Sequence, residues 1–418
     1  MPSATHLSIV IATHNRRDVI VRTLGRLVEL GDELAGSETI VVDNASTDGT
    51  ADAITERFAR VRLVRLNHNA GSCGKAFGTE RAVGDTILFL DDDSYPHPGS
   101  VRRMLARFNT DNGLGAAGFC VHLSDGGAEC SALPGVFVGC GVGLRAEAYH
   151  ACGGLDGDLF MQAEEYDLCF RLAAHGWRTA VFDDLHVHHD KTPRSRSAPI
   201  RAYRDTLNNL LVAVRYIPAA RLAQVFDDWA LRYRWHYADP VCAAEVDRAV
   251  IDGRARRRRD RAAYATARLS ALSFERYFGY GRIATAMQQL RCDGVRRVLL
   301  AGLGKNVYPF VAGARQAGLA IMAIADGRYA AAGRCYRGIA IVDDRSAGQM
   351  AADAVVVSDT SRVHGCRRAL AWRSRTTLPV YAPGVAGAGG DSSWHATASG
   401  LGSLAESPRV GGRVCPTG

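Results

Sequence analysis

The segment Thr86–Ser94, which reads TILFLDDDS, constrains the fold more than any other part of the sequence. A mostly apolar run leads directly into three carboxylates, Asp91, Asp92 and Asp93. Such a run is typical of a buried strand in an α/β sheet, where ligands gather beyond the carboxyl ends of the strands. Because residues two apart in an extended segment point the same way, Asp91 and Asp93 can share one divalent cation. The alternative interpretation is an acidic turn that caps the next helix.

Strands and helices alternate along the N-terminal part of the chain. Apolar runs at Leu7–Ala12, Thr39–Val42 and Arg62–Leu66 predict strands, and a helical pattern follows each of them. This order predicts a parallel, doubly wound sheet. Polar residues follow these strands and the acidic one, namely Thr13, Asp43, Asn67, Asn69 and the three aspartates. Their repetition at one edge of the sheet predicts a nucleotide-binding cradle.

A later helix, predicted to end at Gly176, carries Glu164, Glu165 and Asp167 near its start. The helix dipole favours carboxylates there, so a simple acidic first turn is the alternative to a catalytic role.

Three histidines, His186, His188 and His189, come just after a predicted strand at Thr179–Phe182. Strand alternation places His186 and His188 on one face and His189 on the other. We interpret the cluster as the source of one histidine that completes the metal site of the aspartates.

The residues from about 199 to 290 read as helical and include an arginine-rich run, Gly253–Arg261. This run could bind an anionic lipid surface or a lipid diphosphate, or it could be a solvated helix face.

A third unit follows, with strands predicted within Val295–Asn306, at Ala320–Ala325 and at Ala354–Val357. Gly302 and Gly304 begin a GxGxxG pattern whose third position is Val307, and Asp326 lies where a ribose-binding acid would fall.

The net charge, the cysteine content and the length of the apolar runs limit the classes of partner that the chain can have. The net charge of +8 suggests acidic partners such as nucleotide diphosphates or anionic lipids. No nucleic-acid-binding module is recognisable, so we expect no nucleic-acid partner. Eleven cysteines without paired spacing, together with the lack of a leader pattern, predict a cytoplasmic protein. No apolar run approaches the length of a bilayer span, so any membrane contact would be peripheral, at the inner face of the membrane.

The chain from Leu7 to about His189 resembles family 2 of the inverting nucleotide-sugar glycosyltransferases, which have the GT-A fold. The resemblance rests on five segments in the family's order: LSIVIATHNR, IVVDNASTDGT, NHNAGSCGKAFGTERAVGDTILFLDDDS, FVGCGVGLRAEAYHACGGLDGDLFMQAEEYDLCFRLAAHGW and LHVHH. It implies an α/β GT-A domain with a mixed, mainly parallel sheet and helices on both faces. The predicted units are the GT-A domain (1–200), a helical region (201–292), a Rossmann-like module (293–382) and a disordered tail (383–418).

The resemblance also implies roles for individual residues. Asp91 and Asp93 match the DxD motif that holds Mg²⁺ or Mn²⁺, and His188 matches the family's late histidine, with His189 as the alternative. AEEYDL matches a segment in which an aspartate usually occupies the position of Glu165, which leaves the choice of base between Glu165 and Glu164 open. Asp167 would orient the acceptor or the base. The residues expected to bind the nucleotide sugar are Thr13, Arg16, Asp43, Asn69, Lys75 and Asp92.

The implied activity is metal-dependent, inverting transfer of a sugar from a nucleotide-diphosphate donor to an acceptor hydroxyl. The acceptor would be a glycan or a lipid-linked molecule in cell-envelope or extracellular polysaccharide synthesis, with a peripheral membrane contact through Arg254–Arg261. Two alternatives are an NAD-linked sugar-modifying enzyme centred on the C-terminal module and a non-catalytic sugar-nucleotide-binding protein.

Overall fold

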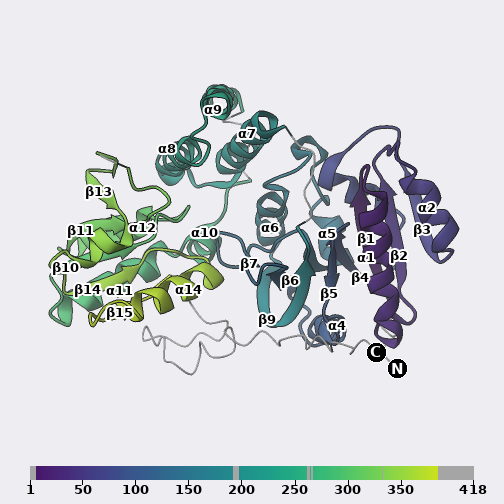
Figure 1. The fold of residues 1–418 in the computed structure, drawn as a ribbon, viewed down its shortest axis with the longest axis horizontal. Helices are drawn as coiled ribbons and strands as arrows, with labels where there is room; N and C mark the ends of the chain where they lie inside the picture. Colours follow the sequence, from purple (N-terminus) through teal and green to yellow (C-terminus); the bar gives the residue numbers. More distant parts are fainter. Residues whose placement is uncertain (1–5, 192–196, 261–263, 265–266, 332, 385–418) are drawn as a thin grey trace, which may run out of the picture.

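The computed structural model describes residues 6–191, 197–260, 264, 267–331 and 333–384. Two separate sheets lie at opposite ends of these residues, and a group of helices lies between them (Figure 1). The predicted tail from residue 385 onward and the loop 192–196 lie outside the described residues.

The first sheet has the strand order β3-β2-β1-β4-β8-β6-β9-β5, with β7 paired to β6. Its strands are β1 (Leu7–Thr13), β2 (Glu38–Asp43), β3 (Val61–Arg65), β4 (Thr86–Asp91), β5 (Ser94–Pro96), β6 (Leu114–Leu123), β7 (Ala128–Glu129), β8 (Gly141–Arg145) and β9 (Arg178–His189). Strands β3, β2, β1 and β4 are parallel, whereas β8 runs antiparallel to both β4 and β6. The sheet is therefore mixed, and the predicted α/β class is confirmed.

Both faces of this sheet are covered by helices. Because side chains alternate along a strand, Ile9 and Ile11 face one layer and Val10 faces the other. Helices α1 (Arg17–Glu29), α2 (Thr50–Arg57) and α4 (Ser100–Thr110) pack on the first face. Helices α3 (Lys75–Thr79), α5 (Ala146–Ala151) and α6 (Glu164–Ala174) lie on the second.

Strand β9 is longer than the predicted Thr179–Phe182 and runs to His189. The three histidines therefore lie within a strand rather than after it. The reason is pairing that is not local in sequence, because β9 continues beside β6 and then pairs antiparallel with β5.

The middle helices share their core with the first sheet. They are α7 (Ala198–Tyr216), α8 (Ala219–His236), α9 (Pro240–Arg259) and α10 (Ala271–Phe278). Leu210, Phe226 and Trp229 from α7 and α8 belong to the same apolar cluster as Leu168 and Phe170 of α6. The boundary predicted at residue 200 thus falls inside α7. No helix within the described ranges combines the length and apolarity that a bilayer crossing requires.

The second sheet has the order β12-β13-β11-β10-β14-β15. Its strands are β10 (Arg297–Ala301), β11 (Ala320–Ala325), β12 (Cys335–Tyr336), β13 (Ile339–Val342), β14 (Ala354–Val357) and β15 (Val380–Tyr381). Its strand pairs are parallel except β12 with β13. Helices α12 (Tyr308–Gln316), α13 (Asp344–Gly348) and α14 (Arg362–Arg373) accompany it, and α11 (Tyr280–Cys292) contributes Ile283 and Met287 to its core.

Candidate active site

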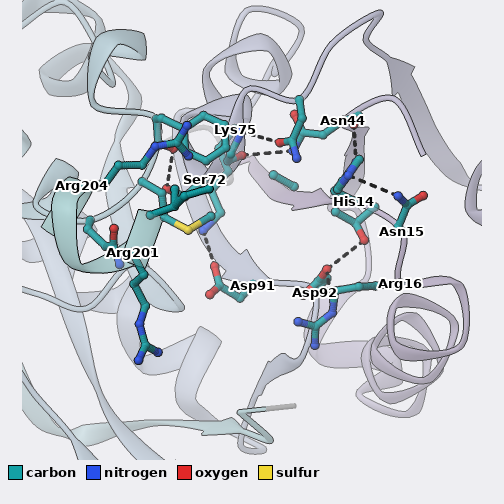
Figure 2. A pocket seen from close by; sticks show the side chains of 18 of the residues that line it. His14, Asn15, Arg16, Asn44, Ser72, Lys75, Asp91, Asp92, Arg201 and Arg204 are labelled. Atoms are coloured by element: carbon teal, nitrogen blue, oxygen red, sulfur yellow. Dashed lines mark hydrogen bonds and ion pairs between the residues drawn. The ribbon is translucent and has the colours of Figure 1, made fainter. Parts of the chain in front are cut away.

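A cavity of about 650 Å³ opens at the carboxyl ends of the parallel strands of the first sheet (Figure 2). Its size suits a ligand of small-molecule dimensions. Strand ends, the loop before α6 and the first turns of α7 all contribute to its wall. The polar residues lining it are Thr13, His14, Asn15, Arg16, Asn44, Asn69, Ser72, Lys75, Asp91, Asp92, Gln162, Ser197, Arg201 and Arg204.

The three aspartates are embedded among basic and hydroxyl groups. Lys75 is buried and places its Nζ 2.8 Å from Asp91 Oδ1. Thr13 donates its hydroxyl to Asp92 at 2.9 Å, and an Nη of Arg16 lies 2.8 Å from Asp93 Oδ2. Burying three carboxylates side by side would otherwise be costly, so these cations and donors allow the cluster to exist.

His189, rather than His188, approaches the aspartates. Ligand atoms of Asp91, Asp93 and His189 all lie within 4.8 Å of one another, and His189 Nε2 is 3.2 Å from Asp93 Oδ1. His188 leaves the opposite face of β9, where its Nε2 lies 3.0 Å from Asp190 Oδ1 and its ring stacks on Tyr95. The structure therefore favours the alternative histidine. Alternation separates the two residues, but only tertiary pairing decides which of them meets the aspartates.

Burial lowers the pKa of His189, but hydrogen bonds with Asp93, Cys140 and Glu129 outweigh that effect and raise it to about 12. A divalent cation would displace that proton, which frees the imidazole nitrogen to act as a ligand. Two carboxylates and one imidazole form a donor set that accommodates Mn²⁺, while Mg²⁺ prefers oxygen ligands alone. These residues thus fit the implied metal ion.

Glu164 and Glu165 begin α6, directly after a segment with unusual backbone geometry. Gln162 and Ala163 have φ values of 72° and 67°, in the left-handed region that side chains disfavour. Such strain persists only where the surrounding structure enforces it, and it often marks functional sites. Gln162 itself lines the cavity, whereas Glu164 and Glu165 are not among its lining residues.

The two glutamates have different surroundings. The Ser72 hydroxyl, on the cavity wall, donates to Glu164 Oε1, while Oε2 is buried without a hydrogen-bond partner among the described residues. Glu165 is less buried, and its Oε1 lies 3.3 Å from the Gly139 N–H. Burial and the neighbouring Glu164 raise the pKa of Glu165 to about 8, and burial also raises the pKa of Glu164. The pair is therefore suited to hold and release a proton near neutral pH.

Asp167 does not line the cavity. It is fully buried and accepts hydrogen bonds from Arg171 Nε at 2.8 Å and Nη2 at 2.6 Å, from Arg215 at 3.1 Å and from the Tyr216 hydroxyl at 2.6 Å. Residues two apart on a helix diverge by about 200°, so Asp167 leaves α6 on nearly the opposite side from Glu165. The carboxylate therefore joins α6 to α7, and a role for Asp167 in orienting the acceptor or the base stays a prediction.

Of the residues expected to bind the donor, Thr13, Arg16, Asn69, Lys75 and Asp92 line the cavity, and Asp43 does not. Asp43 is buried, and its Oδ1 accepts the Ser46 N–H at 3.1 Å. The sequence reasoning missed Asn44, Ser72, Arg201 and Arg204. The i,i+3 spacing of the two arginines could have indicated that they share one face of α7.

A much smaller space lies beside the glycine turn of the second sheet. The space beside Leu303 and Gly304 is about 10 Å³, roughly the room for one water molecule. Arg232 of α8 donates to the Leu303 carbonyl, and Asp326 accepts the N–H groups of Leu303 and Arg328. Asp326 is thus engaged by backbone N–H groups, and the space that the described residues leave beside Leu303 and Gly304 is too small for a dinucleotide.

Comparison with known families agrees with the first sheet and its cavity. Residues 8–135 match the model of glycosyl transferase family 2, and residues 118–246 match that of glycosyl transferase family group 2. Together the two ranges cover more than half of the chain. The chain belongs to glycosyltransferase family 2.

Curated relatives of this family 2 chain include validoxylamine A glucosyltransferase of Streptomyces hygroscopicus subsp. jinggangensis, 33% identical over 115 residues, which cover 25% of this chain and 27% of that protein. Another is the N-acetylglucosaminyl-diphospho-decaprenol L-rhamnosyltransferase of Mycobacterium tuberculosis, 26% identical over 202 residues, which cover 36% of this chain and 66% of that protein. The match to mouse polypeptide N-acetylgalactosaminyltransferase 15 covers 17% of that protein at 29% identity. The matches thus span less than two thirds of each of these relatives.

Two solved structures with similar chains are the Pyrobaculum calidifontis mannosyltransferase PcManGT with GDP-Man and Mn²⁺ and Staphylococcus aureus TarS 1–349 with UDP-GlcNAc. The first has a TM-score of 0.42 at 18% identity and covers 61% of this chain and 76% of its own. The second has a TM-score of 0.46 at 13% identity and covers 74% of this chain and 92% of its own.

Proposed function

We propose that this glycosyltransferase family 2 chain catalyses metal-dependent, inverting transfer of a sugar from a nucleotide-diphosphate donor to an acceptor hydroxyl. The observation that carries the proposal is the convergence of Asp91, Asp93 and His189 beside a cavity of about 650 Å³, whose wall is joined to Glu164 through the Ser72 hydroxyl. The transfer requires a site that binds the departing diphosphate and a base that accepts the proton of the acceptor hydroxyl. Both kinds of group are present.

The donor diphosphate would lie between the aspartates and the basic residues of the cavity. A Mg²⁺ or Mn²⁺ ion held by Asp91, Asp93 and His189 would supply charge neutralisation for the departing diphosphate. Arg201 and Arg204 line the wall formed by α7, and Arg204 stacks over the Phe160 ring with 4.1 Å between its Cζ and the ring centroid. These guanidinium groups suit phosphate oxygens because they are planar and always charged.

Glu165 would act as the general base. It is the less buried glutamate and holds the position of the family's usual aspartate, while Glu164 is bonded to Ser72. A carboxylate with a raised pKa is a stronger base than an ordinary one, and it removes the acceptor proton as the new glycosidic bond forms. Attack opposite the leaving diphosphate inverts the anomeric configuration.

Support for the acceptor class comes from one of the relatives. The M. tuberculosis relative is named for transfer to a lipid-linked diphospho-sugar, which supports a lipid-linked acceptor and a role in cell-envelope synthesis. The last turn of α9 exposes Arg256, Arg258 and Arg259, which could approach an anionic lipid surface, whereas Arg261 lies outside the described residues.

The test is donor binding and transfer with a panel of UDP-, dTDP- and GDP-sugars, with Mn²⁺, with Mg²⁺ and with EDTA, for wild type, Asp93→Asn and Glu165→Gln. We expect Asp93→Asn and EDTA to abolish donor binding, and Glu165→Gln to keep binding but lose transfer. Asp247→Asn, at an exposed ion pair with Arg234, serves as the control. Retention of the anomeric configuration, or full transfer by Glu165→Gln, would refute the mechanism.

A further inference from the structure

Four histidine rings gather on the face of β9 that points away from the aspartates. His97 follows β5, His122 lies on β6, and His186 and His188 lie on β9. The ring centroids are 5.2 Å apart for His97 and His122, 5.1 Å for His122 and His186, and 5.9 Å for His97 and His186. Three separate chain segments therefore contribute to one imidazole cluster, although no role in donor binding requires it.

The spacing of three of these rings matches that of a tetrahedral metal site. A zinc ion about 2.1 Å from an imidazole nitrogen lies about 3.2 Å from the ring centroid, so tetrahedral ligands have centroids about 5.2 Å apart. The measured values lie within about 0.7 Å of this figure. His122 Nε2 and His186 Nδ1 form a hydrogen bond of 3.0 Å, and two nitrogens on one tetrahedral ion would be about 3.4 Å apart, so these two rings are already near the required spacing. The nitrogens of the three rings do not all lie within 4.8 Å of one another, so the His97 ring must turn about its Cβ–Cγ bond for one of its nitrogens to reach the same ion.

The charge state also suits a metal. Burial, helped by the neighbouring histidines, lowers the pKa of His97 to about 4, and burial lowers the pKa of His122 and His186 as well. Arg103 and Arg367 add positive potential at His186 and His122, while Asp183 and Asp184 partly oppose it at His186. The rings are thus neutral at physiological pH, which is the form that binds transition metals.

We propose that His97, His122 and His186 form a binding site for one zinc-class transition-metal ion, separate from the Asp91–Asp93–His189 cluster. His188, whose ring centroid lies 6.4 Å from that of His97, borders the fourth position, which it or a water molecule fills. An ion here joins β5, which follows Asp93, to β9, which carries His189. It thereby stabilises the two strands that hold the donor-site ligands in place.

The experiment uses the full chain, stripped of metal with a chelator, dialysed and titrated with Co²⁺ in the absence of donor and acceptor. We expect one equivalent to produce the visible absorption of tetrahedral cobalt, and Zn²⁺ to displace it, because zinc binds nitrogen ligands more tightly than cobalt. His122→Ala and His97→Ala should each lose this absorption. Asp93→Asn and His175→Ala, the latter at an exposed histidine of the same chain, should keep it.

Circular dichroism and the melting temperature of each metal-free variant establish that it is folded, and His97 offers a second variant on a loop if His122→Ala fails to fold. In the wild type, Zn²⁺ should also raise the melting temperature by a few degrees, and this rise should vanish in His97→Ala. Absence of tetrahedral absorption in the wild type, or its loss in Asp93→Asn with retention in His122→Ala, would overturn the proposal. Because no sugar nucleotide is present, the outcome is independent of whether transfer occurs.

Discussion

Replacement of Asp167 by alanine should destabilise the protein rather than remove a catalytic group. The Asp167 side chain is 1% exposed, and Arg171 and Arg215, its ionic partners, are 19% and 12% exposed. In Asp167→Ala these guanidinium groups lose the carboxylate that accepts their hydrogen bonds, and because they are largely buried, bulk water cannot take its place. Removing one member of a buried ion pair costs about 3–5 kcal/mol. Asp156, which also pairs with Arg215 at 2.6 Å, offsets part of that loss and favours the lower end of the range.

The measurement is thermal and urea unfolding followed by tryptophan fluorescence, because Trp229 lies in the same core as α6 and α7. A loss of about 3 kcal/mol corresponds to a fall in Tm of roughly 6–12 °C for a domain of this size. The control is Asp247→Ala, whose partner Arg234 is 2.6 Å away but 41% exposed, and where we expect a loss below about 1 kcal/mol.

Donor binding by the folded fraction of Asp167→Ala should remain, because the carboxylate does not line the cavity. The reasoning would be refuted if Asp167→Ala unfolded at the wild-type temperature and lost kcat. That result would return Asp167 to the catalytic role that the sequence suggested.

Three further predictions concern Glu165, Gly71 and Lys305. The kcat/KM of the wild type should rise with pH with an apparent pKa near 8, since Glu165 must lose its proton to act as a base, and Glu165→Gln should lack that rise. Gly71→Ala should weaken donor binding and cost about 1–3 kcal/mol of stability, measured by calorimetry and urea unfolding, because Gly71 has φ +65° and a Cβ there would lie 2.3 Å from the Phe160 carbonyl oxygen. Lys305 lies between the Tyr166 and Trp229 rings, and burial lowers its pKa from 10.5 to about 7. Between pH 7 and pH 10.5 the Lys305 side chain is protonated in the unfolded chain but not in the folded chain, so this residue makes the free energy of unfolding rise with pH. Lys305→Met should lack this rise. The explanation would be contradicted if urea titrations gave wild type and Lys305→Met the same pH dependence.

Much of the first sheet could be predicted because its signals are local. The apolar runs that end in Thr13, Asp43 and Asp91 are buried parallel strands, and their carboxyl ends meet at one cavity. The spacing of Asp91 and Asp93 anticipated that their oxygens would lie together, because two-residue periodicity is a property of the extended backbone itself.

The sequence left the position of a side chain open wherever a local pattern allows two placements of that side chain. The helical period separates Asp167 from Glu165 by about 200°, but it does not say which side faces ligand and which side meets Arg171, Arg215 and Tyr216 from α7. The GxG turn at Gly302 is present as the sequence suggested. Its ligand-binding edge is nevertheless covered by Arg232, a residue distant in sequence.

The sequence by itself determined the family, the alternation of strands and helices, and the chemical types gathered at the strand ends, because motifs and periodicities are written in neighbouring residues. Only the tertiary structure decided that His189 rather than His188 meets the aspartates, that α7 supplies Arg201 and Arg204 to the cavity, and that four histidines from three segments converge behind β9. Each of these outcomes depends on which strand or helix packs beside which. That choice follows from burying apolar surface across the whole chain, and no short window of sequence contains it.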